Sequence, residues 1–112
     1  MSLITPEELR EAQGRLRGVA LRTPLIPMEV LAERGSLWLK PECLQPIGSF
    51  KLRGAYNKIA QLPVKERARG VVAFSSGNHG QGVAYAARAM GIKAVIVMPS
   101  NAPEIKRKAV AA

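Results

Sequence analysis

The stretch VVAFSSGNHGQGVAYAARAMGIKAVIVM, residues 71–98, decides the fold. Its apolar start, Val71–Phe74, has the length and composition of a buried strand. A loop of small polar residues leads into an alanine-rich segment, which predicts a helix over 79–90 that ends at Gly91. The apolar run Ala94–Met98 predicts a second strand, parallel to the first and covered on both faces. These patterns together predict a βαβ unit and an α/β fold.

The segments outside this unit are predicted from caps and breakers. Thr5-Pro6-Glu7-Glu8 is a capping-box sequence with proline at the first helical position, so we expect a helix over 6–18. We further expect an extended piece at Pro24–Pro27, a short helix over Met28–Arg34 and a strand over Ser36–Lys40. A loop at Gln45–Gly48 should follow, and then a helix capped by Ser49 and ended by Pro63. A final helix should start near Asn101–Glu104.

Composition limits the class of protein. The chain has 112 residues, of which 47% are hydrophobic, and this fits a globular domain rather than a disordered chain. No apolar run is long enough to span a bilayer, and the acidic N-terminal segment lacks a signal-peptide pattern. The single cysteine, Cys43, cannot form an internal disulfide. We therefore expect a cytoplasmic protein without a membrane partner.

The net charge of +9 raises nucleic-acid binding as an alternative function. The basic residues are spread along the chain, with short clusters at 65–69 and 106–108. Aromatic residues make up only 4% and none of them interleaves with these clusters, as a base-stacking surface would require. The clusters are better interpreted as solvated helix faces, and we expect no nucleic-acid partner.

The residue inventory excludes several catalytic mechanisms. His79 is the only histidine and the chain has no aspartate, which excludes a Ser-His-Asp triad and a zinc site built from several His and Cys ligands. We expect no metal site. The glycine spacing after Phe74 matches neither a dinucleotide-binding nor a Walker-type phosphate motif.

Lys51 is the first candidate for chemistry. It lies at the start of a predicted helix, where the exposed peptide N–H dipoles disfavour an ammonium group and make the free amine more accessible. A free lysine amine can attack a carbonyl and form a Schiff base. Phe50 can supply an apolar face beside it. Spacing alone also fits an ordinary solvated lysine.

The loop Ser75-Ser76-Gly77-Asn78-His79 is the second candidate. Small residues at a helix start let backbone N–H groups point at a carboxylate or phosphate. The alternative is an ordinary strand-to-helix turn in which Asn78 caps the helix. Local sequence does not separate these two interpretations.

At these two motifs the sequence resembles the fold type II pyridoxal-phosphate enzymes, in particular the threonine/serine dehydratase and serine racemase branch. The resemblance is carried by the stretch LKPECLQPIGSFKLRGA, residues 39–55, and by SSGNHGQ, residues 75–81. Phe50, Leu52 and His79 favour this branch over the cysteine synthases. The resemblance implies that pyridoxal 5'-phosphate is the cofactor.

The family's site residues carry over onto matching positions. Lys51 would hold the cofactor as a Schiff base and take the substrate Cα proton. Phe50 would pack on the cofactor ring, and Asn78 would contact its 3-hydroxyl oxygen. Residues Ser75, Ser76, Gly77, Asn78 and His79 would bind the substrate carboxylate. In the racemase branch, the residue at the position of Ser76 is a second catalytic acid/base.

The implied function is β-elimination of L-threonine or L-serine to a keto acid and ammonia, with serine racemase as the alternative. The resemblance also implies a homo-oligomer and places residues 1–68 in the family's large domain and 69–112 at the start of its small domain. The family's glycine-rich phosphate loop is not within these residues. We therefore expect an N-terminal fragment that alone binds the cofactor poorly. An inactive structural fragment or a basic binding module are the alternatives from other classes.

Overall fold

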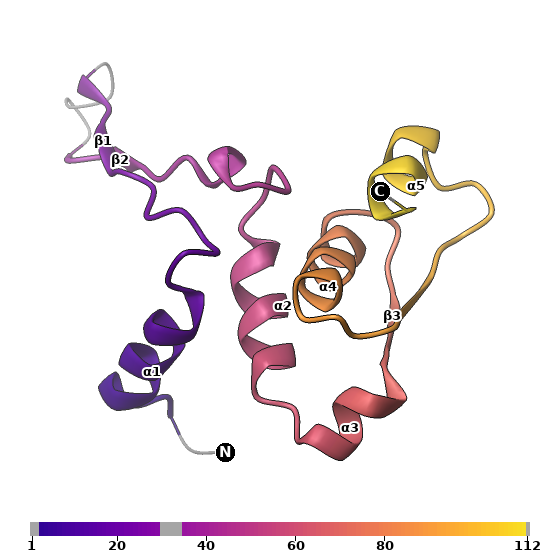
Figure 1. The fold of residues 1–112 in the computed structure, drawn as a ribbon. Helices are drawn as coiled ribbons and strands as arrows, with labels where there is room; N and C mark the ends of the chain where they lie inside the picture. The colour runs from indigo at the N-terminus through magenta and orange to yellow at the C-terminus, as the bar shows by residue number, and fades with distance from the viewer. Residues whose placement is uncertain (1–2, 30–34, 112) are drawn as a thin grey trace.

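The computed structural model describes residues 3–29 and 35–111, which form a mixed α/β structure (Figure 1). The helices are α1 (Pro6–Leu16), η2 (Glu42–Leu44), α2 (Lys51–Ala60), α3 (Val64–Arg69), α4 (Asn78–Ala89) and α5 (Glu104–Ala111), and the strands are β1 (Ile26–Pro27), β2 (Trp38–Leu39), β3 (Val71–Phe74) and β4 (Ala94–Val97). Helices α2 and α4 lie side by side, and α1 lies on the far side of α2.

The predicted βαβ unit is confirmed. Strands β3 and β4 pair in parallel, with Val71 opposite Ala94 and Phe74 opposite Val97. Helix α4 connects them and begins one residue before the predicted start. Each strand lies within one residue of its predicted bounds because the apolar runs and the flanking glycines mark it locally.

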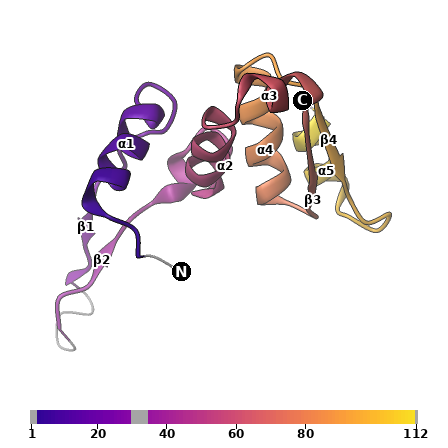
Figure 2. The same cartoon turned by 90° about the horizontal axis from the view of Figure 1, so that it is seen from below.

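The sheet is covered on one face by the described residues, so the prediction of cover on both faces is wrong for this part of the chain. Exposure alternates along both strands. Ala73 and Ile96 pack toward the core beside α4, whereas Val72 and Phe74 are 75% and 73% exposed. Figure 2 shows α4 between α2 and the sheet, so the strand side chains that pack against the core are those on the α4 side.

The core forms where α2 packs on α4. Ala55 and Ile59 of α2 meet Val83 and Ala86 of α4, and all four are buried. The two backbones approach closely at Gly82, where a Cβ atom would lie 3.1 Å from the carbonyl oxygen of Lys51. Small residues on α4 therefore bring it directly against the first turn of α2.

Gly70 sets the start of β3. Its φ of +86° lies in the left-handed region, and a Cβ atom there would lie 2.6 Å from the Lys93 carbonyl oxygen. The next amide, Val71 N–H, donates to that same oxygen at 2.8 Å. Only glycine has both the conformational freedom and the space that this position requires.

The predicted N-terminal helix is confirmed, but it is shorter than predicted. The Thr5 hydroxyl accepts a hydrogen bond from the Glu8 N–H at 3.2 Å, and the Thr5 N–H donates to the Glu8 carboxylate at 2.7 Å. Helix α1 then ends at Leu16, two residues before the predicted end. Strand β2 is shorter than the predicted strand over 36–40 and pairs antiparallel with β1.

Three further predictions have different outcomes. Most of the short helix expected over 28–34 lies outside the described residues. The basic cluster at 65–69 lies on helix α3, and all five of its residues are exposed. Helix α5 begins at Glu104, within the predicted start. No helix in the described ranges is long and apolar enough to cross a membrane.

The prediction that Ser49 caps α2 is wrong. Phe50 occupies the cap position with helical dihedrals, φ −63° and ψ −13°, and no side chain bonds to the first N–H groups. Ser49 lies one residue earlier, where its buried hydroxyl oxygen has no hydrogen-bond partner among the described residues. The helix begins at Lys51, one residue later than a Ser49 cap requires, and the Ser49 hydroxyl makes no hydrogen bond to an amide of α2.

Candidate functional site

Lys51 is the first residue of α2, as the sequence predicts, and its side chain is exposed. Its Nζ atom lies 4.7 Å from the centroid of the Phe50 ring, a cation–π geometry. The backbone behind it is fixed by the close contact with Gly82. A rigid helix start thus presents a primary amine next to an aromatic face.

A cavity of about 490 Å³ opens beside this amine, between α2 and β3. Phe50, Lys51 and His79 contribute to its lining, and most of the remaining wall is apolar, with Leu62 and Val83 among its residues. This size falls within the usual range for small-molecule sites. The cavity combines a nucleophilic amine, an aromatic ring and apolar walls, which is what a planar carbonyl compound needs.

Ser75 holds the loop that leads into α4. Its hydroxyl oxygen accepts hydrogen bonds from the N–H groups of Gly77 at 3.2 Å and Gly80 at 2.9 Å. Gly77 takes the cap position and Asn78 is the first residue inside the helix. The alternative in which Asn78 caps α4 is therefore wrong, because the Ser75 hydroxyl already binds the first-turn amide of Gly80.

Asn78 is joined to the C-terminal helix. Its Oδ1 atom accepts a hydrogen bond from the Nζ atom of Lys106 on α5 at 2.7 Å. The Lys106 chain also passes Gly77, where a Cβ atom would lie 3.9 Å from its Cδ atom. Lys106 is not predicted as a site residue, since the contact is between elements that are far apart in sequence and no local pattern marks it.

The predicted site residues fall into two groups on neighbouring parts of the structure. Phe50, Lys51 and His79 line the cavity, whereas Ser75, Ser76, Gly77 and Asn78 do not. The second group forms the turn between β3 and α4 and the first residue of α4, directly before His79. The Ser76 side chain is exposed and makes no hydrogen bond to any described residue. His79 is the residue that belongs to both the loop and the cavity wall.

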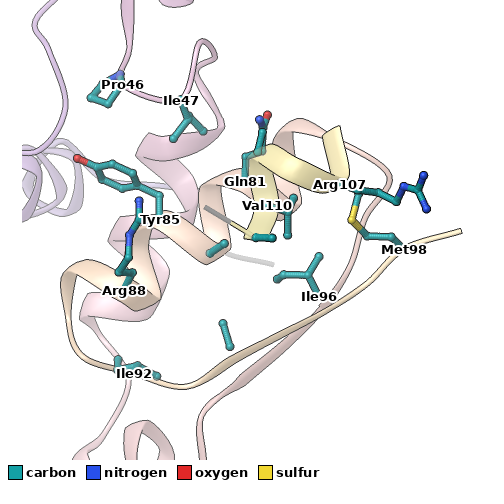
Figure 3. A pocket seen from close by; sticks show the side chains of 14 residues that line it. Pro46, Ile47, Gln81, Tyr85, Arg88, Ile92, Ile96, Met98, Arg107 and Val110 are labelled. Carbon is teal, nitrogen blue, oxygen red and sulfur yellow. The ribbon is translucent and has the colours of Figure 1, made fainter. Parts of the chain in front are cut away.

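A larger cavity of about 1070 Å³ lies elsewhere, where α4, α5, β4 and the loop at 46–47 meet (Figure 3). Tyr85 and Arg88 of α4 and Arg107 of α5 are part of its wall. Gln81 also lines it, and its Oε1 atom is buried without a partner among the described residues. None of the predicted site residues lines this cavity, so it is separate from Lys51.

A polar cluster precedes Lys51 and was not predicted from sequence. Glu42 in η2 binds Arg53 in α2, and the Arg53 guanidinium holds the pKa of the Glu42 carboxyl at about 2, below its ordinary value of 4.5. Hydrogen bonds from Thr23 and Gln45 lower this pKa further, while partial burial opposes them. The same pairing raises the pKa of Arg53. Within residues 3–29 and 35–111 no group of His, Cys, Asp or Glu could hold a metal ion.

The comparisons with known proteins agree with this architecture. Residues 16–112 match the family described as pyridoxal-phosphate dependent enzyme. An L-threonine ammonia-lyase from Thermotoga maritima is 57% identical over 103 residues, which are 90% of this chain and 26% of that protein. A biosynthetic L-threonine dehydratase from Haemophilus influenzae is 51% identical over 99 residues, 87% of this chain and 19% of that protein.

A solved structure has the same fold. Serine racemase from Dictyostelium discoideum superimposes with a TM-score of 0.89 at 38% identity, over 96% of this chain and 36% of that one. The chain thus spans 19% to 36% of the length of these three proteins. From the family match and the shared fold, the chain belongs to the fold type II pyridoxal-phosphate dependent enzymes.

Proposed function

We propose that Lys51 binds pyridoxal 5'-phosphate covalently and that the protein is an ammonia-lyase for L-threonine or L-serine. The observation that carries this proposal is the exposed Lys51 amine beside the Phe50 ring, at the wall of an apolar cavity of about 490 Å³. These groups fit the aldehyde and the aromatic ring of the cofactor. When bound, the cofactor supplies an electron sink for charge that develops on the substrate.

The chain's own residues would bind the substrate and transfer its proton. Lys51, as a free amine, would take the proton from the substrate Cα atom. The Ser75, Gly77 and Gly80 amides already have acceptors, so the amides of Ser76, Asn78 and His79 would bind the substrate carboxylate, because anions are stabilised at a helix N-terminus. Asn78 would help to hold the cofactor through its side-chain amide, whose Oδ1 atom accepts a hydrogen bond from Lys106 in this structure.

A borohydride-trapping experiment tests the role of Lys51. The intact protein is incubated with pyridoxal 5'-phosphate, reduced with borohydride and digested for peptide mapping. We expect the pyridoxyl label on Lys51 and its loss in Lys51→Ala, with Lys58→Ala as the control from the same helix. Label that persists in Lys51→Ala contradicts the proposal.

Serine racemase is the second candidate, and the fold similarity to a serine racemase supports it. Racemisation needs a proton donor on the face opposite Lys51, and the exposed Ser76 hydroxyl is the candidate. Product analysis with L-serine separates the two activities. Pyruvate and ammonia alone support the lyase, whereas D-serine that is lost in Ser76→Ala supports the racemase.

The wider assignment follows the same proposal. We propose that the protein is a cytoplasmic homo-oligomer. Residues 1–68 would belong to its large domain, and residues 69–112 would form the start of its small domain. A small amino acid, rather than nucleic acid, would be its partner. The Arg67 side chain in the basic cluster supports this, because it donates to the carbonyl oxygens of Leu62 at 2.8 Å and Ala60 at 2.6 Å and so closes the end of α2.

A further inference from the structure

We infer that Glu42 and Arg53 form a latch that positions the Lys51 amine, and that both are positioning residues for its chemistry. This inference rests on the proposed function of Lys51 and assigns roles to two residues that do not form the Schiff base. The latch is defined as Glu42, Arg53 and the two side chains that bind Glu42, namely Thr23 and Gln45.

The centre of the latch is a two-point ion pair. Arg53 Nε donates to Glu42 Oε2 at 2.7 Å, and the Arg53 terminal nitrogen donates to Glu42 Oε1 at 2.8 Å. Two parallel bonds fix the plane of both groups, so the pair sets a direction as well as a distance. The side chains are 17% and 31% exposed, which limits competition from water.

The remaining bonding capacity of Glu42 is also used. The Thr23 hydroxyl donates to Oε1 at 2.6 Å, and the Gln45 amide donates to Oε2 at 3.2 Å. Each carboxylate oxygen thus accepts from Arg53 and from one other side chain. A carboxylate with this many donors has one orientation, because any rotation breaks several bonds together.

The latch ties three separate segments together. Arg53 and Gln45 both donate to the carbonyl oxygen of Leu21, at 2.7 Å and 2.8 Å, and the Leu21 N–H donates to the Gln45 side chain at 2.9 Å. Lys40 adds a bond to the Thr23 carbonyl oxygen at 2.9 Å. The segment at 21–23, helix η2 and the first turn of α2 are therefore held together by side-chain hydrogen bonds.

Lys51 lies between two fixed points. On one side, Arg53 holds the first turn of α2 to the latch. On the other, the Lys51 carbonyl faces the closest approach of α4, at Gly82. The loop at 45–50 connects the latch directly to Lys51. The latch therefore restricts the position of the Lys51 backbone, and with it the position of the amine relative to the cavity. Loss of the latch frees one of these two points while α4 still holds the other.

Competitive labelling of amines tests the latch without the cofactor. A trace of acetic anhydride is applied across a pH series, and the extent of labelling at each lysine is mapped by mass spectrometry. Lys58 lies on the same helix and is exposed, so the Lys51-to-Lys58 labelling ratio reports a change specific to Lys51. A loss of stability that is not specific to Lys51 would change both lysines together.

Three latch variants and one control are compared. Glu42→Gln and Arg53→Met remove one partner, and Arg53→Lys keeps the charge but loses the planar fork. Glu7→Gln removes an ion pair of the same chemistry, Glu7 with Arg10 at 2.7 Å, on the exposed face of α1. Circular dichroism confirms that each protein is folded before labelling.

We expect all three latch variants to change the Lys51-to-Lys58 ratio by about threefold or more and to shift its pH profile, while Glu7→Gln leaves both unchanged. A ratio that stays within the scatter of the control in folded latch variants overturns the inference, even if their stability falls. A normal ratio in Arg53→Lys alone also overturns it, because charge rather than the two-point geometry would then be sufficient. Failure of the proposed function is distinguished by borohydride trapping, which can fail while the labelling ratio still depends on the latch.

Discussion

The segment that leads to Lys51 and the helix that follows the serine-rich loop are held by different forces. Before Lys51, polar side chains bond across the chain around Glu42, with little apolar burial. In α4, the lack of side chains at Gly80 and Gly82 lets the helix pack closely against its neighbours, and the Ser75 hydrogen bond lies at its start. The first region depends on charge and the second on volume. A substitution that changes only one of these properties should therefore affect only one region.

The largest effect is expected where volume is added to α4. Gly82→Val places side-chain atoms against the Lys51 carbonyl, where a Cβ atom alone would already lie at 3.1 Å. Because backbone cannot yield as a flexible side chain does, we expect a loss of about 3 kcal/mol in the free energy of unfolding, measured in urea.

The matched control for this change is Gly14→Ala in α1, where no atom lies within 4 Å of the added methyl group. It should gain about 0.5–1 kcal/mol from helix propensity. If Gly82→Val lowers the free energy of unfolding by less than about 1 kcal/mol, close packing at this position does not hold α4 in place.

The next effect is expected in the polar region. Glu42→Gln keeps the shape but removes the charge that Arg53 binds, and we expect a loss of about 2 kcal/mol near neutral pH. The exposed pair at Glu7 should change by less than about 0.5 kcal/mol in Glu7→Gln. Equal losses in the two variants, measured by urea unfolding, would contradict the contrast between the partly buried pair and the exposed pair.

The same carboxylate predicts a pH dependence. Its pKa is about 2 in the folded chain and 4.5 ordinarily, so its full stabilisation is present above pH 4.5 and is lost as the pH falls toward 2. The difference in unfolding free energy between the natural chain and Glu42→Gln should therefore shrink across this range. A difference that stays constant there would be inconsistent with the ion pair.

A smaller effect is expected at the turn before α4. Ser75→Ala removes the acceptor for the Gly77 and Gly80 amides and should cost about 1 kcal/mol. The neighbouring change Ser76→Ala should alter stability by less than about 0.5 kcal/mol, because that side chain is exposed and unbonded among the described residues. Thermal unfolding of the two variants separates the capping serine from the candidate catalytic one.

The smallest effect is expected at Lys106. Lys106→Met removes the exposed hydrogen bond to Asn78 and should cost about 0.5 kcal/mol, with Lys65→Met on α3 as the control. The Lys106→Met variant measures how strongly α5 stabilises the loop that leads into α4. Hydrogen exchange at the Asn78 and His79 amides should accelerate in Lys106→Met and not in Lys65→Met.

The elements around the predicted parallel sheet could be read from local sequence. The bounds of β3, α4 and β4 are correct within one residue, because apolar runs and glycines act on neighbouring positions. The predicted Ser49 cap and the alternative Asn78 cap fail for one cause. Each gave the cap to a polar residue near the helix start, whereas Phe50 and Gly77 take the cap positions.

The polar network before Lys51 could not be predicted in the same way. Its partners are separated by 11 residues for Glu42 and Arg53, 24 for Leu21 and Gln45, and 32 for Leu21 and Arg53. These separations follow no helix or strand period, and they depend on how the segments fold back on each other. The motif at 39–55 marked the region, but only the folded chain shows which of its polar side chains bind one another.

The missing methyl group at Gly70 has a consequence at the other end of its strand. It lets the Val71 amide reach Lys93, which fixes Val71 opposite Ala94 and hence Ser75 N–H opposite the Val97 carbonyl, at 3.0 Å. A slip of one residue would turn every side chain of β3 to the opposite face. The placement of the Ser75 hydroxyl at the start of α4 is thus decided by an alignment made at the first residue of the strand, which links the geometry of the turn at 75–77 to Gly70.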